Sequence, residues 1–290
     1  MILFTFAILL PPYTSSQFDL PGRMADLVPS VFRIVKGQPC SVRDHPYMIS
    51  LQLAPAMRHF CGGTLLSPGA VLTAAHCIID FENNPGDIWA VAGLTEDEPS
   101  DIQMRRVRSV HIPRSYSTVT MVGDIGILVV DSAFVMDDFV HPVAIYPYRS
   151  TDVVKFCPRG QIMGWGSTSS ETRGVEEPVL RCAVVPVLSH SKCQQHLHLF
   201  MDRSKICALG QGEDACIGDS GGPMMCGGVQ IGIISSGHGC GAKNHPGVYT
   251  RVDYYFKYIT RIVNGQSKCF DGKVVVFSVT ACLASFIIDF

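Results

Sequence analysis

Twelve cysteines in a chain of 290 residues are the feature that most limits how this sequence can fold. A reducing cytosol keeps cysteines as thiols, whereas an oxidising compartment pairs them as disulfides. Metal binding is the other common use, but the sequence contains no Cys-x-x-Cys pair and no His-x-x-x-His pair, and such clusters are typical of zinc sites. We therefore expect an exported protein held together by disulfides, and no bound metal.

The first residues also suggest export. An apolar run from Ile2 to Leu10 is followed by small residues near Ser15 and Ser16, which resembles a secretory signal peptide. The run lacks a basic segment beyond the amino terminus, and a buried first strand is the alternative interpretation. We assign residues 1–16 to a signal peptide, and this assignment predicts a secreted, extracellular protein.

The C-terminal extension, residues 265–290, carries a second apolar stretch after Lys273. This stretch is shorter than the ~20 residues that cross a bilayer as a helix. Three interpretations stay open: a thin membrane anchor, a tail that is removed when a lipid anchor is attached, and an extension packed on the domain. Attachment to a membrane through residues 273–290 is therefore an open expectation.

Charge and composition exclude other classes of function. The formal net charge is −2, charged residues make up 17% of the chain, and no long basic run is present. Such a composition is typical of a globular protein and not of a disordered one. Nucleic acid is not expected as a partner, since its binding requires a basic surface.

Short apolar runs bounded by Gly, Pro, Asp and Ser predict a protein built mostly of strands. Regular spacing of such strands favours a sandwich or a barrel. One segment differs: in residues 254–265, Phe256, Ile259 and Val263 recur at helical spacing, which predicts a closing helix. A shorter helix is expected near residues 190–200. The expected strands are 47–53, 62–67, 70–75, 87–93, 125–131, 160–167, 181–188, 229–236 and 247–252.

Three side chains are candidates for nucleophilic acyl transfer, which needs a hydroxyl, a base and an acid that holds the base. Ser220 lies in the glycine-rich stretch GDSGGP, where amide N–H groups can converge on one point. His76 ends an apolar strand, beside two small alanines. Asp124 leads into an apolar run, where a carboxylate is costly unless it is hydrogen-bonded. The alternatives are a plain turn, a core histidine and a capping aspartate.

Six motifs occur in order along most of the chain: RIVKG, LTAAHC, DIGIL, GWG, GDSGGP and PGVYT. By these motifs the chain resembles the trypsin/chymotrypsin family of serine proteases. The resemblance implies a hydrolase domain, a serine endopeptidase, over residues 34–264. It also implies an all-β fold of two antiparallel six-stranded β-barrels packed together, with a C-terminal helix.

The resemblance assigns a role to each candidate. His76, Asp124 and Ser220 match the catalytic triad: Ser220 attacks the scissile carbonyl, His76 takes its proton, and Asp124 orients the imidazole. The backbone N–H groups of Gly218 and Ser220 match the oxyanion hole. No cofactor is implied, and the acidic stretch 93–101 does not match the calcium loop of the family.

The family's disulfide pattern accounts for ten of the twelve cysteines. Cys269 and Cys282 are left over, and the sequence leaves open whether they pair with each other, pair between chains or are acylated. The implied pairs are Cys40–Cys182, Cys61–Cys77, Cys157–Cys226, Cys193–Cys207 and Cys216–Cys240.

The resemblance also implies a zymogen. Cleavage between Arg33 and Ile34 would free an α-amino group, which pairs with Asp219 in the activated enzyme. Residues 17–33 are then an activation propeptide, and they contain no cysteine that would tether them. Lys36 departs from the pattern, since the family usually has glycine there.

Substrate preference is expected to rest on Asp214, which matches the bottom of the specificity pocket. A buried carboxylate there favours Arg or Lys immediately before the cut, with some preference for Arg because Ala215 lacks a hydroxyl. Gly237 and Gly247 match the open pocket walls, and Ser235 is a further substrate-binding candidate.

The largest departure is Ser236, where the family usually carries a tryptophan shelf for substrate residues upstream of the cut. This departure leaves one rival hypothesis, a catalytically weak protease-like binding protein of the same fold. The expected partners are protein or peptide substrates with Arg or Lys before the cut, and protein protease inhibitors.

Overall fold

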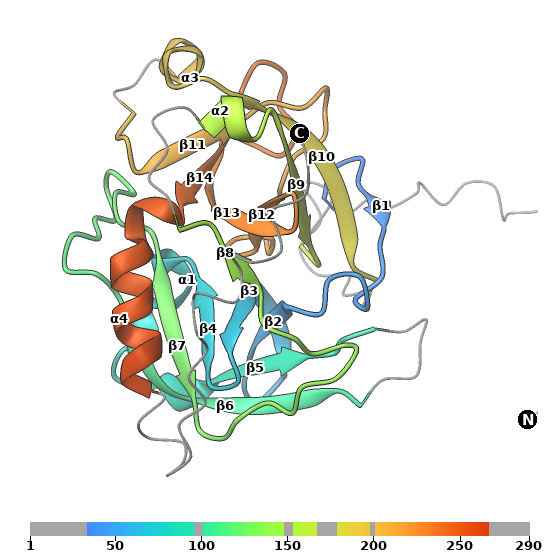
Figure 1. Ribbon diagram of the computed structural model, residues 1–290, viewed down its shortest axis with the longest axis vertical. Helices are drawn as coiled ribbons and strands as arrows, with labels where there is room; N and C mark the ends of the chain where they lie inside the picture. The colour runs from blue at the N-terminus through green and yellow to red at the C-terminus, as the bar shows by residue number, and fades with distance from the viewer. Residues whose placement is uncertain (1–33, 96–100, 148–152, 167–178, 198–200, 267–290) are drawn as a thin grey trace, which may run out of the picture. The chain divides into compact units, whose positions relative to one another are not determined.

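The structure is a computed structural model, and it describes residues 34–95, 101–147, 153–166, 179–197 and 201–266 (Figure 1). The expected signal peptide, the propeptide up to Arg33 and the apolar tail with Cys269 and Cys282 lie outside these residues. Within the described ranges, no helix is long and apolar enough to cross a membrane.

The first barrel is closed and has six antiparallel strands in the order β2-β3-β4-β7-β6-β5. Its interior is filled by aliphatic side chains, and all five residues of β7 are buried. This agrees with the Val, Ile and Leu content of these strands, because branched side chains pack well on a pleated surface. The strands are β2 (Met48–Leu53), β3 (Arg58–Ser67), β4 (Ala70–Thr73), β5 (Ile88–Ala92), β6 (Gln103–His111) and β7 (Gly126–Val130).

The second barrel closes in the same way, since β9 and β10 pair with each other and complete the ring β9-β10-β11-β14-β13-β12. Short strands β1 (Gln38–Pro39) and β8 (Ala144–Ile145) add to β10 and β13. The barrel strands are β9 (Arg159–Gly164), β10 (Arg181–Leu188), β11 (Lys205–Ala208), β12 (Pro223–Cys226), β13 (Val229–Ser236) and β14 (Gly247–Arg251).

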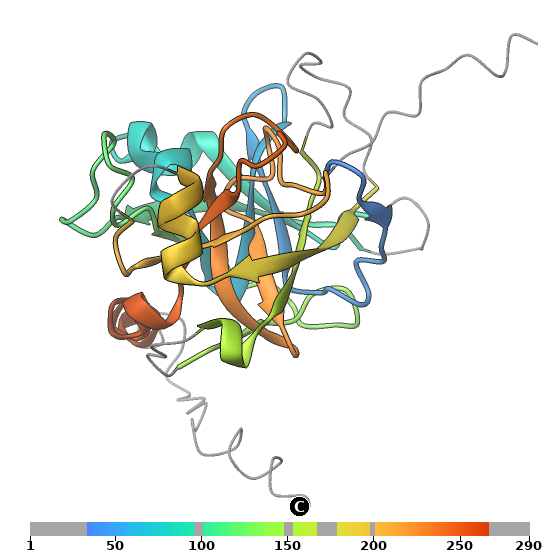
Figure 2. The same ribbon diagram turned by 90° about the horizontal axis from the view of Figure 1, so that it is seen from above.

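Helices are few among the described residues. The C-terminal helix α4 (Phe256–Gln266) follows the second barrel but packs against the first, beside β7 (Figure 1). Seen from above, α4 is the red-orange helix viewed nearly along its axis (Figure 2). Ile259 is buried in the core of the first barrel, together with Tyr255. The others are α1 (Ala75–Ile78), α2 (Val153–Phe156), α3 (His190–Leu197) and the 3₁₀ turns η2 (Ile79–Phe81), η3 (Pro85–Asp87) and η4 (Asp253–Tyr255).

The nine expected strands and the closing helix are present, and the two six-stranded barrels confirm the expected fold. Sequence patterns missed β6, because it contains Arg105, Arg106 and Arg108 and lacks a long apolar run. It forms because it pairs with both β5 and β7. The patterns also missed the short strands β1, β8, β11 and β12, which depend on partners elsewhere in the barrels.

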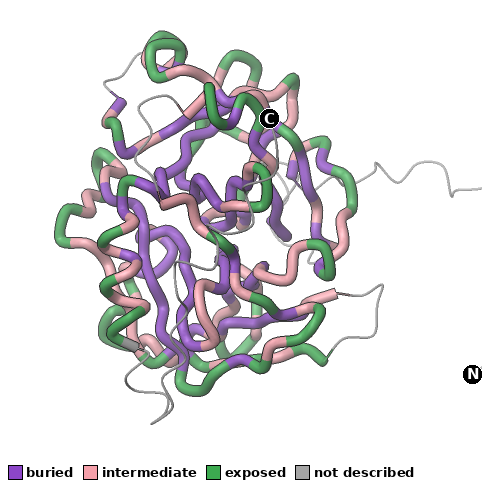
Figure 3. The backbone as a smooth tube through the Cα atoms, in the orientation of Figure 1, coloured by how far each residue is buried: buried purple, intermediate pink, exposed green. Residues whose placement is uncertain are grey.

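The buried residues follow the barrel strands, as the purple segments of Figure 3 show. Five disulfides join the same cysteines as the family pattern implies, with S–S distances from 2.00 to 2.12 Å. Two of them bear on the site: Cys61–Cys77 next to His76, and Cys216–Cys240 next to Asp214.

Candidate active site

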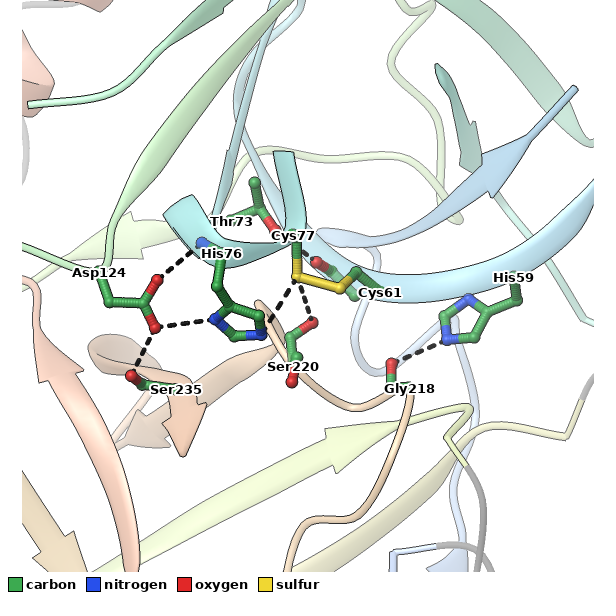
Figure 4. Close-up of a disulfide and its surroundings, with 10 residues drawn as sticks. His59, Cys61, Thr73, His76, Cys77, Asp124, Gly218, Ser220 and Ser235 are labelled. Carbon is green, nitrogen blue, oxygen red and sulfur yellow. Dashed lines mark hydrogen bonds and ion pairs between the residues drawn. A yellow bond between two sulfur atoms is a disulfide. The ribbon is translucent and has the colours of Figure 1, made fainter. Parts of the chain in front are cut away.

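His76 and Asp124 meet because they lie at the neighbouring ends of two paired strands. Thr73 in β4 pairs with Gly126 in β7. The segment after β4, which carries His76 as the second residue of α1, therefore meets the segment that leads into β7, which carries Asp124. The backbone N–H of His76 donates to Asp124 Oδ1 at 2.9 Å, and His76 Nδ1 lies 2.9 Å from Asp124 Oδ2 (Figure 4). This double contact fixes the imidazole and leaves Nε2 directed away from Asp124.

Asp124 receives a third hydrogen bond, and this one crosses between the barrels. The hydroxyl of Ser235, at the end of β13, donates to Asp124 Oδ2 at 2.5 Å. Asp124 is fully buried and Ser235 is only 5% exposed. Three donors therefore compensate the burial of this carboxylate. Sequence reasoning assigned Ser235 to substrate binding and did not find this contact.

Ser220 lies in the turn before β12, and that turn is held against the first barrel. The N–H of Gly62 donates to the Ser220 carbonyl at 2.8 Å. A Cβ on Gly221 would lie 2.2 Å from Thr73 Oγ1 and 2.4 Å from the Gly62 carbonyl, so only glycine fits there. Figure 4 shows Ser220 beside the imidazole of His76.

No hydrogen bond joins Ser220 Oγ to His76 Nε2 within the described part of the chain. The nearest recorded contact of Nε2 is to Cys77 Sγ, at 3.7 Å. In enzymes without substrate, the hydrogen bond between nucleophile and base is often long, and it tightens in the complex. The arrangement therefore places a hydroxyl next to a base that is already oriented by a carboxylate.

The turn before Ser220 presents two amide donors. Asp219 is fully buried, and its carboxylate accepts from the N–H groups of Gly166 and Cys216, each at 2.8 Å. Its own N–H donates to the Cys216 carbonyl. In contrast, the N–H groups of Gly218 and Ser220 donate to no other described residue. They can serve an oxygen of a bound molecule.

His59 helps to set this orientation, and sequence reasoning missed it. His59 Nε2 donates to the Gly218 carbonyl at 2.9 Å, and its Nδ1 lies 2.8 Å from Ser50 Oγ. Gly218 has φ +97°, and a Cβ there would lie 2.9 Å from the Cα of Gly166, so a side chain is excluded. His59 lies two residues before Cys61 and outside the expected strand 62–67, so the sequence carried no signal for this contact.

Asp214 is held in a second polar pocket, on the other side of the same loop. It is 7% exposed, and its two carboxylate oxygens accept from the N–H groups of Ala215 and Gly241 at 2.9 and 3.0 Å. Burial raises the pKa of Asp214 above its usual range, although the two N–H donors oppose this shift. A positive charge beside this carboxylate would stabilise its ionised form.

The glycines near Asp214 leave space for such a group. A Cβ on Gly247 would lie 2.9 Å from Asp214 Oδ1 and 3.0 Å from the Tyr249 hydroxyl, and a Cβ on Gly237 would lie 3.9 Å from the Cα of Gly247. The Tyr249 hydroxyl is buried and has no hydrogen-bond partner in the described structure. Gly247 therefore lies against Asp214, and Gly237 lies beside Gly247.

The segment after Arg33 lies against this pocket. Ile34 is fully buried in the core of the second barrel, and the N–H of Val35 donates to the Asp214 carbonyl at 2.9 Å. Arg33 itself lies outside the described residues. Ser236 is exposed at the end of β13, next to Gly237 in the chain. It lacks the aromatic surface of the tryptophan that the family usually has at this position.

Two groups of histidine and cysteine lie close enough to hold a metal ion: Cys40, His45 and Cys182, and Cys61, His76 and Cys77. In both groups the cysteines are joined in a disulfide, so neither offers a thiolate. These two groups therefore do not support a metal centre.

Comparisons with known proteins agree with this geometry. The family model described as Trypsin matches residues 34–259. The chain is similar to a trypsin of Saccharopolyspora erythraea, with 33% identity over 237 residues, which is 80% of this chain and 98% of that protein. It is also similar to trypsin II-P29 of Gallus gallus (33% over 233 residues; 80% and 89%) and trypsin alpha of Drosophila melanogaster (30% over 235 residues; 80% and 88%).

Proposed function

Because this chain belongs to the trypsin family of serine endopeptidases, we propose that it is secreted as a zymogen and cleaves peptide bonds after Arg or Lys. The observation that carries the specificity is the buried Asp214, which lies beside two glycines and an unpartnered tyrosine hydroxyl. A long cationic side chain would fill this space and pair with the carboxylate. Its own hydrogen bonds would also satisfy the polar atoms there.

The triad performs acyl transfer in two steps. Ser220 Oγ bonds to the scissile carbonyl carbon while its proton passes to His76 Nε2, and that proton then leaves with the departing amine. Water, deprotonated by the same nitrogen, next attacks the acyl carbon. The bond from that carbon to Ser220 Oγ breaks, and His76 returns the proton to Ser220 Oγ. The contacts of Asp124 with His76 Nδ1 and the backbone support this role, since they orient the imidazole and stabilise its cation.

The oxyanion is stabilised by the N–H groups of Gly218 and Ser220. Negative charge develops on the substrate oxygen in the transition state, and pre-oriented donors need no reorganisation there. The hydrogen bond from His59 Nε2 to the Gly218 carbonyl supports this assignment, because it directs that carbonyl toward His59 and away from the site of the oxyanion.

Activation by cleavage between Arg33 and Ile34 is supported by the burial of the new terminus. Ile34 is fully buried and Asp219 is a fully buried carboxylate. An α-ammonium on Ile34 would pair with Asp219 and fix the turn that carries Gly218. The released propeptide is residues 17–33, and the activator is a protease that cuts after arginine, including this enzyme itself.

The rival hypothesis, a catalytically weak protease-like binding protein of the same fold, is not favoured, because all three triad residues are present in matching motifs. Substrates and inhibitors are therefore expected to be extracellular proteins or peptides with an exposed Arg or Lys. Without the aromatic shelf at Ser236, upstream substrate residues add less binding energy.

The test is to cleave the recombinant protein after Arg33 and to compare Arg, Lys and Phe amide substrates. We expect turnover of the Arg and Lys substrates only, and none by Ser220→Ala. If the cleaved wild type is as inert as Ser220→Ala, the enzyme mechanism is wrong. If Phe substrates are cut as fast as Arg substrates, the specificity is wrong. If the uncleaved chain is fully active, the proposal that it is a zymogen is wrong.

A further inference from the structure

We propose that Lys36 is a positioning residue for the Asp214 pocket: its ammonium holds the loop of residues 209–213, which packs against the donor to Asp214. This inference rests on the proposed function of Asp214. Lys36 lines an open cavity of about 480 Å³, whose other lining residues are 208–214, including Asp214, and 241–245.

The first contact joins Lys36 to the peptide group of Gln211. Lys36 Nζ donates to the Gln211 carbonyl at 2.9 Å, and the Gln211 N–H donates to Glu213 Oε2 at 2.7 Å. The two peptide groups that flank Gln211 are therefore both held, the one after it by a cation on its oxygen and the one before it by an anion on its nitrogen. Hydrogen bonds to charged groups are stronger than those between neutral groups.

The lysine stem also lies across the loop. A Cβ on Gly212 would lie 2.5 Å from Lys36 Nζ and 2.8 Å from Lys36 Cε, and Gly212 has φ +110°. The loop therefore leaves an open place at Gly212, and the lysine side chain fills it. The contact is one of packing as well as charge.

The loop transmits its position to the carboxylate through Gly241. A Cβ on Gly241 would lie 2.7 Å from the Gly212 carbonyl and 3.1 Å from Val35 Cγ1. The N–H of Gly241 donates to Asp214 Oδ2. A shift of Gly212 would therefore displace a donor to Asp214, while Val35 binds the Asp214 backbone from the other side.

The backbone of Lys36 supports a specific role for this side chain. Its φ is +56°, a left-handed conformation that glycine adopts freely and lysine does not. The family resemblance gives glycine at this position, so the lysine is a departure made against the backbone preference. The contacts with Gln211 and Gly212 compensate for it.

The test uses protein cleaved after Arg33, with active sites titrated, and benzamidine as the cationic probe of the Asp214 pocket. In Lys36→Met, which keeps the stem and removes the ammonium, we expect the benzamidine Ki and the KM for an Arg amide to rise about 5- to 20-fold, with kcat within about 2-fold of wild type. Lys36→Arg should restore most of the affinity.

Two further variants separate positioning from stability. Lys36→Gly removes the contact but relaxes the backbone, so we expect a Ki as weak as that of Lys36→Met with an equal or higher Tm. Lys243→Met, which removes an exposed ammonium at the edge of the same cavity, should leave Ki within about 2-fold.

An unchanged Ki in Lys36→Met would overturn the inference. A fall in Tm and kcat with the same Ki would also overturn it, since it would indicate a structural role alone. Failure of the proposed specificity is recognised separately: wild type would not bind benzamidine, or Asp214→Ser would bind it equally well, whatever Lys36 does.

Discussion

The two barrels contribute to the site in different ways. The first barrel supplies His76 and Asp124 from the ends of paired strands, where the β4–β7 ladder sets their positions. The second barrel supplies Ser220, the amide donors and Asp214 from loops outside its strands. The base and its acid therefore depend on regular hydrogen bonding, whereas the nucleophile and the pocket depend on local contacts.

Loops need other constraints to be as rigid as strand ends. Three features constrain the loops of the second barrel. They are glycines that leave no room for a side chain, a disulfide from Cys216 to Cys240, and the Asp219 carboxylate, which accepts hydrogen bonds from two backbone N–H groups. We expect damage to the first barrel's contribution to reduce kcat, and damage to the loops of the second to change substrate binding as well.

The largest effect should come from the triad. Ser220→Ala and His76→Ala should each reduce kcat by a factor on the order of 10⁶, because each removes a step of the same proton transfer. The double variant should be no worse than either one, and steady-state assays of activated protein measure this. His141→Ala, an exposed histidine away from the site, is the control. Independent, multiplying losses would contradict a joint role of the two barrels.

The second largest effect should come from Asp214. Asp214→Ser should reduce kcat/KM for Arg amides roughly 30- to 4,000-fold, which corresponds to a loss of about 2–5 kcal/mol of transition-state stabilisation. The reason is that the substrate cation is left unpaired in a buried place. Acylation by a small uncharged ester should change little. A similar loss for both substrates would show that Asp214 supports the loop and not the specificity.

Two disulfides test the comparison directly. Cys61–Cys77 and Cys216–Cys240 close loops of similar length, with sequence separations of 16 and 24, so each should contribute about 3 kcal/mol to the free energy of unfolding. Replacing the second pair with alanine should raise the KM for Arg amides, whereas replacing the first should mainly reduce kcat. Denaturant unfolding and kinetics of both variants measure this. If both changes affect KM equally, the division between the barrels fails.

A smaller effect is expected at the contact between the barrels. Ser235→Ala removes a hydrogen bond to the buried Asp124 carboxylate, worth about 1.5–3 kcal/mol, and should reduce kcat roughly 10- to 100-fold. Thr64→Val is the matched control, since Thr64 Oγ1 donates to Gln230 on the same strand β13 at 2.8 Å. The control should lower stability with kcat nearly unchanged. An equal loss of kcat in both variants would indicate barrel packing as the cause.

The smallest effect concerns stability and pH. Burial raises the pKa of Asp214 above its ordinary value of 3.8, so the folded state binds its proton more tightly than the unfolded state does. The contribution of Asp214 to stability therefore falls as pH rises from the pKa of the unfolded state to the higher pKa of the folded state. At neutral pH the charge of Asp214 opposes folding. Asp214→Asn should raise Tm by a few degrees at pH 7 and by less at pH 3. A lower Tm at pH 7 would contradict this sign.

Much of the molecule follows from sequence alone. The apolar runs identified nine strands and the closing helix, because burial on one or two faces leaves a readable pattern. The motifs around His76, Asp124 and Ser220 indicated the family, and the resemblance then gave Asp214 as the candidate for the specificity pocket. Strand β6 was not predicted, because its arginines interrupt the apolar pattern of a strand. It pairs with β5 on one side and β7 on the other.

The tertiary structure decided the contacts that cross between distant segments. Ser235 with Asp124, His59 with Gly218, and Lys36 with Gln211 join residues that are 111, 159 and 175 positions apart. No local pattern records such pairs, because each side chain alone suits an ordinary strand or loop. The sequence indicated which groups are the candidates for the chemistry and which segments bear them. Tertiary packing, both between the barrels and within the second one, decided which polar atoms hold those groups in place, since a hydrogen bond depends on distance in space and not on spacing along the chain.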